Sequence, residues 1–288
     1  MTIYELSIIS TTGFPYFNKQ IRPIPEGVKV FLRFFDFSQE KSVDQDQMDL
    51  ESKFDLTAGL ISALFEFARN IDKKIEVLEF KPKKENKPQF IKNKLHSLGD
   101  VLITVQTDPF LLHNSVQEKV NLIYNTIITS KIPLDSGEEM MNGEVDKMVN
   151  ILTDSKARER ILNHKNKIKL LANNFLNEMK GYGLEGICIT SFDLSPIIVF
   201  GKKYSLEKVN QILRHIGFIP DIPPLEWIYR QSFISDEQIQ VCIVKSGVGP
   251  TIEDILFEPY FYLLFADPQS YFGEFPAKLT TSLNDILG

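Results

Sequence analysis

The chain of 288 residues is 43% hydrophobic and 24% charged, and its formal net charge is −6 with a pI near 5.4. This length and balance favour a globular protein with a substantial core, and they suggest two domains of ordinary size. The acidic balance argues against general nucleic-acid binding, which needs a basic surface, but it leaves room for a local basic patch.

The two cysteines, Cys188 and Cys242, each lie in an apolar run. This setting favours buried free thiols in a reducing compartment over a disulfide. The first five residues lack the basic region and the apolar core of a signal peptide, and no apolar run approaches the ~20 residues of a spanning helix. We therefore expect a cytoplasmic protein, with peripheral contact at a membrane surface as the only membrane role.

Alternating apolar residues predict strands in the first part of the chain. Residues 3–10 form the first of these, and a turn at Thr12-Gly13 returns residues 14–18 as its partner. The other elements predicted up to residue 130 are strands at 28–37, 75–80 and 100–106, a helix at 54–72 with Asp55 as its N-cap, and a helix after Asp108-Pro109.

The composition of residues 131–143 is typical of a linker, and residues 144–180 have a helical pattern with a break near Thr153-Asp154-Ser155. After a stop at 181–183 the order of the first half returns. The predicted elements are strands at 184–192, 196–201, 227–234, 238–245 and 257–265, a helix capped by Ser205, and a final helix over Phe275 to Ile286. Residues 247–250 (GVGP) predict a hairpin turn, because the third glycine of a nucleotide-binding loop is missing.

Both halves share the order strand, turn, strand, helix, several strands, Asp-Pro, helix. The closest local match is between ITVQTDPF at 103–110 and YLLFADPQ at 262–269. We therefore predict an α+β fold built from a duplicated domain, in which two mostly antiparallel five-stranded sheets are flanked by helices. The predicted divisions are an N-terminal domain at 1–130, a helical linker at 131–183 and a C-terminal domain at 184–288.

No motif for catalysis or for a cofactor emerges. The four histidines, at positions 96, 113, 164 and 215, do not pair at a metal-binding spacing, and neither cysteine has a partner that would complete a zinc site. Phosphate-loop, calcium-loop and nucleophile-elbow patterns all fail. We predict that the protein is not an enzyme and that it has no catalytic, cofactor or metal residues.

Two basic segments allow two interpretations. Residues 81–94 carry six lysines and one acidic residue, and residues 156–169 carry six basic residues along a helix with an apolar stripe. One interpretation is a solvated hairpin tip and an ordinary docked helix. The other is contact with an anionic membrane, for which Lys83, Lys84 and Lys87 are the candidate residues.

The predicted helix at 54–72 is apolar over an arc of roughly 220°, whereas a one-sided surface helix has a stripe of about 100°. Its second stripe consists of Ala58, Ile61, Phe65 and Ala68. The equivalent helix of the second half, around 206–216, is apolar over only about 120°. The second stripe therefore needs a cover, which is another part of this chain, another protein chain or, as a third alternative, a small molecule.

The order of hairpin, helix LTAGLISALFEFARNI (residues 56–71), further strands and closing helices resembles a longin domain, in the longin, roadblock and profilin-like group. The resemblance covers residues 3–130, and it extends to residues 184–287 through the order of elements and the Asp-Pro echo. It implies a non-catalytic module of tandem longin-like domains that acts in small-GTPase regulation, vesicle trafficking or scaffolding. SNARE-type fusion is not implied, because no heptad segment follows the domain.

The resemblance implies a small GTPase or another longin or roadblock protein as partner, bound through Ala58, Ile61, Phe65 and Ala68, and it allows homo- or hetero-oligomers. The alternative function is a sensory or small-molecule-binding module, because profilin-like and PAS-like folds use similar elements. Nucleic acid is not an expected partner.

Overall fold

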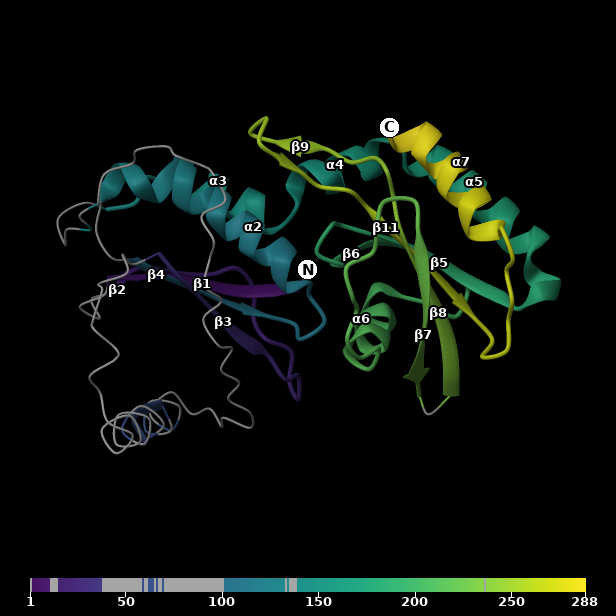
Figure 1. Cartoon of the computed structure of the whole chain (residues 1–288), viewed down its shortest axis with the longest axis horizontal. Helices are drawn as coiled ribbons and strands as arrows, with labels where there is room; N and C mark the ends of the chain where they lie inside the picture. The colour runs from purple at the N-terminus through teal and green to yellow at the C-terminus, as the bar shows by residue number, and fades with distance from the viewer. Residues whose placement is uncertain are drawn as a thin grey trace, which may run out of the picture. The chain divides into compact units, whose positions relative to one another are not determined.

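A computed structural model describes residues 2–10, 15–37, 101–132, 134, 139–235 and 237–288, together with the helical residues 59, 62–64, 66 and 69. Residues 1–38 and 98–288 belong to one compact unit, and residues 39–97 belong to a second. Figure 1 shows the first unit as an α+β structure, and its described strands form a four-stranded sheet, a five-stranded sheet and a two-stranded ribbon, all antiparallel. The division at 1–130, 131–183 and 184–288 stays a prediction.

The first sheet has the strand order β2-β1-β4-β3 in the described residues, and all of its pairs are antiparallel. Its strands are β1 (Ile3–Ser10), β2 (Pro15–Gln20), β3 (Phe31–Asp36) and β4 (Val101–Thr107). These strands agree with the predictions at 3–10, 14–18, 28–37 and 100–106. The strand predicted at 75–80 lies outside the described residues.

Helix α2 (His113–Ile123) covers one face of this sheet, and a π-helical turn at Tyr124–Ile128 extends it (Figure 1). The buried side chains of β1 and β4 belong to the same core cluster as Val116, Val120 and Ile123 of α2. The apolar spacing predicted α2, but it did not predict the π-helical turn.

Three helices connect the sheets, namely α3 (Asn142–Leu152), α4 (Ser155–Asn163) and α5 (Lys165–Glu178). The predicted break between α3 and α4 is confirmed, because Asp154 adopts left-handed backbone angles with φ of 54°. A second break at His164 was not predicted. The stop after α5 is confirmed by Gly183, whose φ is 83°.

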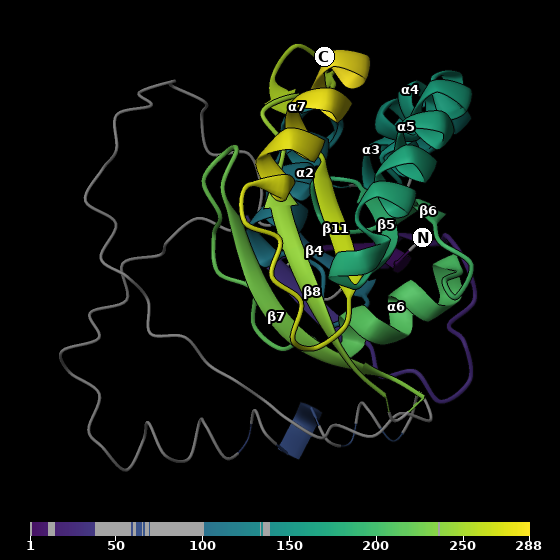
Figure 2. The ribbon, with the colours of Figure 1, turned by 90° about the vertical axis from the view of Figure 1, so that its right-hand side faces the viewer.

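The second sheet has five antiparallel strands in the order β6-β5-β11-β8-β7. Its strands are β5 (Leu184–Thr190), β6 (Pro196–Phe200), β7 (Trp227–Ile234), β8 (Glu237–Lys245) and β11 (Phe261–Ala266). Figure 2 shows α6 (Leu206–Arg214) on one face and α5 with α7 (Phe275–Leu287) on the other. Ser205 caps α6 as predicted, since its Oγ accepts a hydrogen bond from the backbone NH of Lys208.

The predicted hairpin turn at 247–250 was wrong. Pro250 and Val248 instead pair with Glu258 and Tyr260 through backbone hydrogen bonds, and the turn lies at Glu253-Asp254, between β9 (Thr251–Ile252) and β10 (Leu256–Phe257). Gly249 is needed for close approach, because a Cβ there would lie 1.9 Å from the carbonyl oxygen of Glu258.

Within the second unit, the described members of the 54–72 segment are helical, in agreement with the prediction. Ser62, Glu66 and Arg69 are exposed, and Arg69 forms a 2.9 Å salt bridge with Glu66. Ala63 is exposed and Leu64 is half-buried. The second-stripe residues Ala58, Ile61, Phe65 and Ala68 lie outside the described residues.

Candidate interaction surface

The register of the first sheet assigns each side chain to one of its two faces, since directly opposed residues point to the same side. Leu6 is opposite Val105, which is opposite Arg33, and Ile8, Ile103 and Phe35 form the next row. These two rows face α2 and are buried. The alternate residues, such as Ser7, Thr104 and Phe34, therefore form an outer face.

Strand β3 is an edge of this sheet in the described part of the chain, because it pairs with β4 and with no other described strand. An edge strand presents unpaired backbone NH and C=O groups and is a ready template for another chain. The edge at β3 is therefore a structural candidate for partner binding.

Large apolar side chains are exposed on this edge. Leu32 is 42% exposed and Phe34 is 53% exposed on the outer face, and Phe31 is 52% exposed at the start of the strand. Edge strands of monomeric proteins are usually protected by charged residues or by proline. Three exposed apolar side chains within four residues of an edge strand are instead typical of an interaction site.

The outer face is polar on the side away from β3. The Nδ2 of Asn18 donates to Glu5 Oε1 at 2.6 Å and to Ser7 Oγ at 2.9 Å, and the Nε2 of Gln106 donates to Glu5 Oε2 at 2.7 Å. Leu32 and Phe34 lie at the β3 margin of this face, and the half-buried Ile9 and Leu102 complete its apolar part. We call Phe31, Leu32 and Phe34 the β3 surface.

Arg33 anchors β3 from the inner face. Its Nε donates to Thr107 Oγ1 at 2.8 Å, and one terminal NH2 group donates to the carbonyl oxygen of Leu111 at 2.6 Å. Burial lowers the pKa of Arg33 to about 10, although the charge of Asp193 opposes that shift. Phe35 also stacks on the His113 ring, with ring centroids 5.7 Å apart. The strand is therefore held in place from inside while Leu32 and Phe34 point outward. Phe31 lies at the start of the strand on the Arg33 side, where the Arg33 guanidinium is 5.8 Å from its ring centroid.

A group of buried charged side chains surrounds Lys119 of α2 in the protein interior. Its ammonium group lies 2.6 Å from Asp193 Oδ2, and it also forms an ion pair with Asp154. All three side chains are 0–1% exposed. Glu258 is 1% exposed close to this group, and within the described residues neither of its carboxyl oxygens has a hydrogen-bond partner.

The electrostatics of these four residues follow from burial and from their mutual charges. Burial raises the pKa of Glu258 to about 8, and the charge of Asp154 contributes to that increase. Burial also raises the pKa of Asp154 to about 6, against the opposing effect of Lys119. Burial alone would raise the pKa of Asp193, but Lys119 and hydrogen bonds from Ser191 and Ser195 lower it to about 2.

Strongly shifted pKa values are frequent in active sites, and they also occur in structural ion-pair networks. A catalytic group must reach a substrate, whereas Lys119, Asp154, Asp193 and Glu258 are almost completely covered by protein. They come from α2, from the turn before α4, from the turn after β5 and from the segment before β11. We therefore interpret this set, which we call the Lys119 cluster, as a buried structural junction.

Further buried bonds join the same parts of the first unit. Asp108, of the predicted Asp-Pro motif, accepts hydrogen bonds from the Tyr4 hydroxyl at 2.7 Å and from Arg214 Nε at 2.7 Å. Ser115 Oγ donates to the carbonyl oxygen of Phe192 at 2.9 Å, and the Thr2 and Ser195 hydroxyls are hydrogen-bonded. These hydrogen bonds thus join residues 2–4 and 108–115 to the turn at 191–195 and to Arg214, which lie far away in the sequence.

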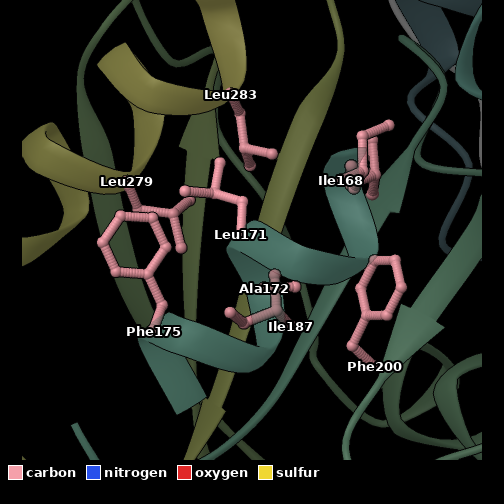
Figure 3. A pocket seen from close by; sticks show the side chains of 9 residues that line it. Ile168, Leu171, Ala172, Phe175, Ile187, Phe200, Leu279 and Leu283 are labelled. Carbon is pink, nitrogen blue, oxygen red and sulfur yellow. The ribbon is translucent and has the colours of Figure 1, made fainter. Parts of the chain in front are cut away.

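A hollow between α5, α7, β5 and β6 is lined by nine apolar side chains, including Ile168, Phe175 and Leu283 (Figure 3). It leaves no room for a water molecule. This hollow is ordinary core packing and gives no support to a small-molecule site.

The site residues predicted from the sequence are different residues from those of the β3 surface. The predicted partner-binding residues (Ala58, Ile61, Phe65 and Ala68) and the predicted membrane-facing residues (Lys83, Lys84 and Lys87) all lie outside the described residues. The β3 surface was not singled out from the sequence, although the run FLRFFD is apolar at both alternating positions and this signal indicates a strand with two apolar faces.

Other sequence expectations concern metals, thiols and membrane spans. Among the described residues, no group of three or more His, Cys, Asp or Glu side chains is arranged to hold a metal ion. Cys188 and Cys242 are buried free thiols, as predicted. No helix in the part of the chain that the structure describes is long and apolar enough to cross a membrane.

The chain matches no protein-family model, no curated protein and no solved structure.

Proposed function

We propose that this protein is a non-catalytic interaction module that binds another protein chain through the β3 surface. The observation that carries the proposal is β3, an edge strand in the described part of the chain, which exposes Phe31, Leu32 and Phe34 and is anchored from inside by Arg33. A partner strand or loop that covers this edge would satisfy its backbone groups and bury its apolar side chains. Preorganised strands bind without an ordering cost, which favours this use.

The proposed partner is a small GTPase or a second longin or roadblock protein, and the proposed setting is trafficking or scaffolding in the cytoplasm. The support is the element order. In residues 184–288 a strand hairpin, a helix, three long strands and a closing helix follow one another. The first half contains a strand hairpin, and its last strand ends at Asp108-Pro109 before a helix. This order supports the longin-like assignment of domains at 1–130 and 184–288, with 131–183 as connector.

The chemistry of the interior supports a non-catalytic role. The strongly shifted carboxyl groups of the described chain belong to the Lys119 cluster, which is buried among α2, the α3–α4 turn and the strands. There they serve to join elements, and a substrate could reach them only after the core had opened.

The test is a titration of the full chain against nucleotide-loaded small GTPases and against longin and roadblock proteins. We expect the double variant Leu32→Glu, Phe34→Glu to bind at least tenfold more weakly, because two buried apolar contacts of about 1.5–3 kcal/mol each would be lost. The matched control is Phe218→Glu, Ile255→Glu, which changes side chains that are 83% and 70% exposed elsewhere.

Circular dichroism and thermal unfolding establish that both variants keep the fold. Equal binding by the wild type and by the Leu32, Phe34 variant would overturn the proposed surface. A small molecule retained in native mass spectrometry, together with no protein partner, would favour the sensory alternative.

The stripe of Ala58, Ile61, Phe65 and Ala68 is a separate proposal for the same partner. The variant Ile61→Glu, Phe65→Glu tests it independently, and the stripe is refuted if partner binding is unchanged while the fold is intact.

A further inference from the structure

The outer surface of α4 and α5 combines positive charge with exposed apolar side chains. Between residues 155 and 180 the chain has seven Lys or Arg and two Glu, whereas the whole chain carries a net charge of −6. The local charge therefore has the opposite sign to that of the whole protein, and an anionic partner would be attracted here rather than elsewhere.

The packing of α5 fixes which of its residues point outward. Ile168, Ala172 and Phe175 are buried against α7 and the second sheet, and Figure 3 shows Phe175 beside Leu279 on that side. Lys165, Lys167, Lys169 and Leu170 occupy other sides of the helix and are exposed.

Several charges of this segment are already used within the protein. Arg158 donates to the carbonyl oxygen of Thr153 at 2.7 Å, and Arg160 donates to that of Gly288 at 2.6 Å. Glu178 forms a 2.6 Å salt bridge with Lys278. By contrast, Lys165, Lys167, Lys169 and Lys180 form no salt bridge with any described residue. Four ammonium groups without a salt bridge to the described residues thus remain along this surface.

Apolar side chains lie among these lysines. Leu162 is 56% exposed, Leu170 is 66% exposed and Tyr182 is 63% exposed. Helix α5 alone is about 21 Å long at 1.5 Å per residue, so the charges and the apolar groups are spread along an extended surface. We call Leu162, Leu170, Tyr182 and the four lysines the connector surface.

This combination favours one class of anion. Sequence-tolerant binding of single-stranded nucleic acid relies on a series of stacking aromatics, of which this surface has one, Tyr182, and specific phosphate recognition favours the forked arginine side chain. The free cations here are all lysines, which act as mobile point charges, and the apolar groups are leucines and one tyrosine. Lysines with exposed apolar groups on a helix lying at a surface are typical of peripheral contact with a bilayer.

We propose that the connector surface binds an anionic lipid bilayer. The lysines contact lipid headgroups while Leu162, Leu170 and Tyr182 enter the interfacial layer. The connector surface shares no residue with the β3 surface.

The test is co-sedimentation of the full chain with vesicles of phosphatidylcholine alone and of phosphatidylcholine with phosphatidylserine, at low and at physiological salt. We expect binding only to the anionic vesicles and weaker binding at the higher salt. The triple variant Lys165→Glu, Lys167→Glu, Lys169→Glu should lose roughly a hundredfold in partitioning, since each lysine contributes about a factor of five.

A matched control makes the same charge change at other exposed lysines, with Lys19→Glu, Lys202→Glu and Lys208→Glu. The control should keep most of the binding. The variant Leu162→Ser, Leu170→Ser should weaken binding without changing its dependence on salt, because no charge is removed.

Equal binding to neutral and anionic vesicles, or equal losses in the triple variant and the control, would overturn the proposal. So would binding to an acidic protein or to single-stranded RNA with no binding to vesicles. Titration of a β3-surface partner against the triple variant separates the two proposals, because that affinity should stay unchanged.

Discussion

Glu258 offers the sharpest test of the Lys119 cluster. Its carboxyl group is 1% exposed and faces the carboxylates of Asp154 and Asp193, with Lys119 and Lys156 as the opposing charges. Its pKa is raised to about 8 from an ordinary value of 4.5. The variant Glu258→Gln keeps the shape of the side chain and removes its ionisation.

The direction in which the stability of the fold changes with pH follows from proton linkage. Between the two pKa values the folded protein holds a proton on Glu258 that the unfolded chain has released, so stability falls as the pH rises. The cost of Glu258 to the folded state is about 1 kcal/mol near pH 5, about 3 kcal/mol near pH 7 and about 4 kcal/mol near pH 8. Glu258→Gln removes this cost, and its stability relative to the wild type should therefore increase by about 3 kcal/mol from roughly pH 5 to roughly pH 8.

The assay is urea unfolding of both proteins, followed by circular dichroism at several pH values in that range. Thermal unfolding gives a second measure, in which 3 kcal/mol corresponds to a gain of roughly 6–10 °C for the variant at the alkaline end. A variant that is less stable than the wild type at every pH, or a difference independent of pH, would refute a buried, protonated Glu258.

Three further predictions follow from single contacts. Lys119→Met should lower the free energy of unfolding in urea by about 3–5 kcal/mol, because it leaves the carboxylates of Asp154 and Asp193 buried without their cation. A decrease of less than about 1 kcal/mol would contradict the proposed junction. Gly249→Ala should lower the free energy of unfolding by about 3–5 kcal/mol, because the new Cβ would meet the Glu258 carbonyl oxygen. The control Gly143→Ala has open space around it in α3 and should be neutral or stabilising. Equal effects at the two glycines would contradict the close approach. Cys188 and Cys242 should not react with a thiol reagent in the native protein, because both are buried and burial raises the pKa of each thiol. Both should react in denaturant. Rapid labelling of the folded chain would contradict this prediction, because it would show that at least one of them is accessible.

Sequence patterns predicted most elements of the first unit because its strands and helices bury one side. The spacing of Val209, Leu213 and Ile216 predicted α6, and these residues are buried in the structure. The apolar run at 28–37 predicted β3 but not its edge position among the described strands. That position depends on which strand pairs with it, and pairing is a property of the whole sheet.

The sequence-based predictions were wrong or incomplete where the local residue types are compatible with more than one backbone structure. Glycine at 247 and 249 indicated a turn, yet Gly249 is required because two backbone segments pass close together. The actual turn uses Glu253 and Asp254 with φ of 51° and 55°, where no glycine or proline marks it. The helix break at His164 likewise contains no glycine or proline that would have predicted it.

The buried junction could not have been found from the sequence. Lys119 occupies a helix position that looks like part of a solvated face, and its partner Asp193 is 74 residues away. Only the packing of α2 beside the turn at 191–195 makes this lysine interior. Long-range ion pairs leave no periodic signal, because neither partner changes the local pattern of apolar residues.

The measurement that tests the central claim most directly is photo-crosslinking from the β3 surface. Phe34 is replaced by p-benzoylphenylalanine, and the chain is irradiated with its binding partner from the titrations; the same replacement at Phe218 is the control. We predict a crosslinked complex from position 34 and none from position 218. Undiminished binding with no crosslink from position 34, or with crosslinks only from position 218, would contradict the assignment of partner binding to β3.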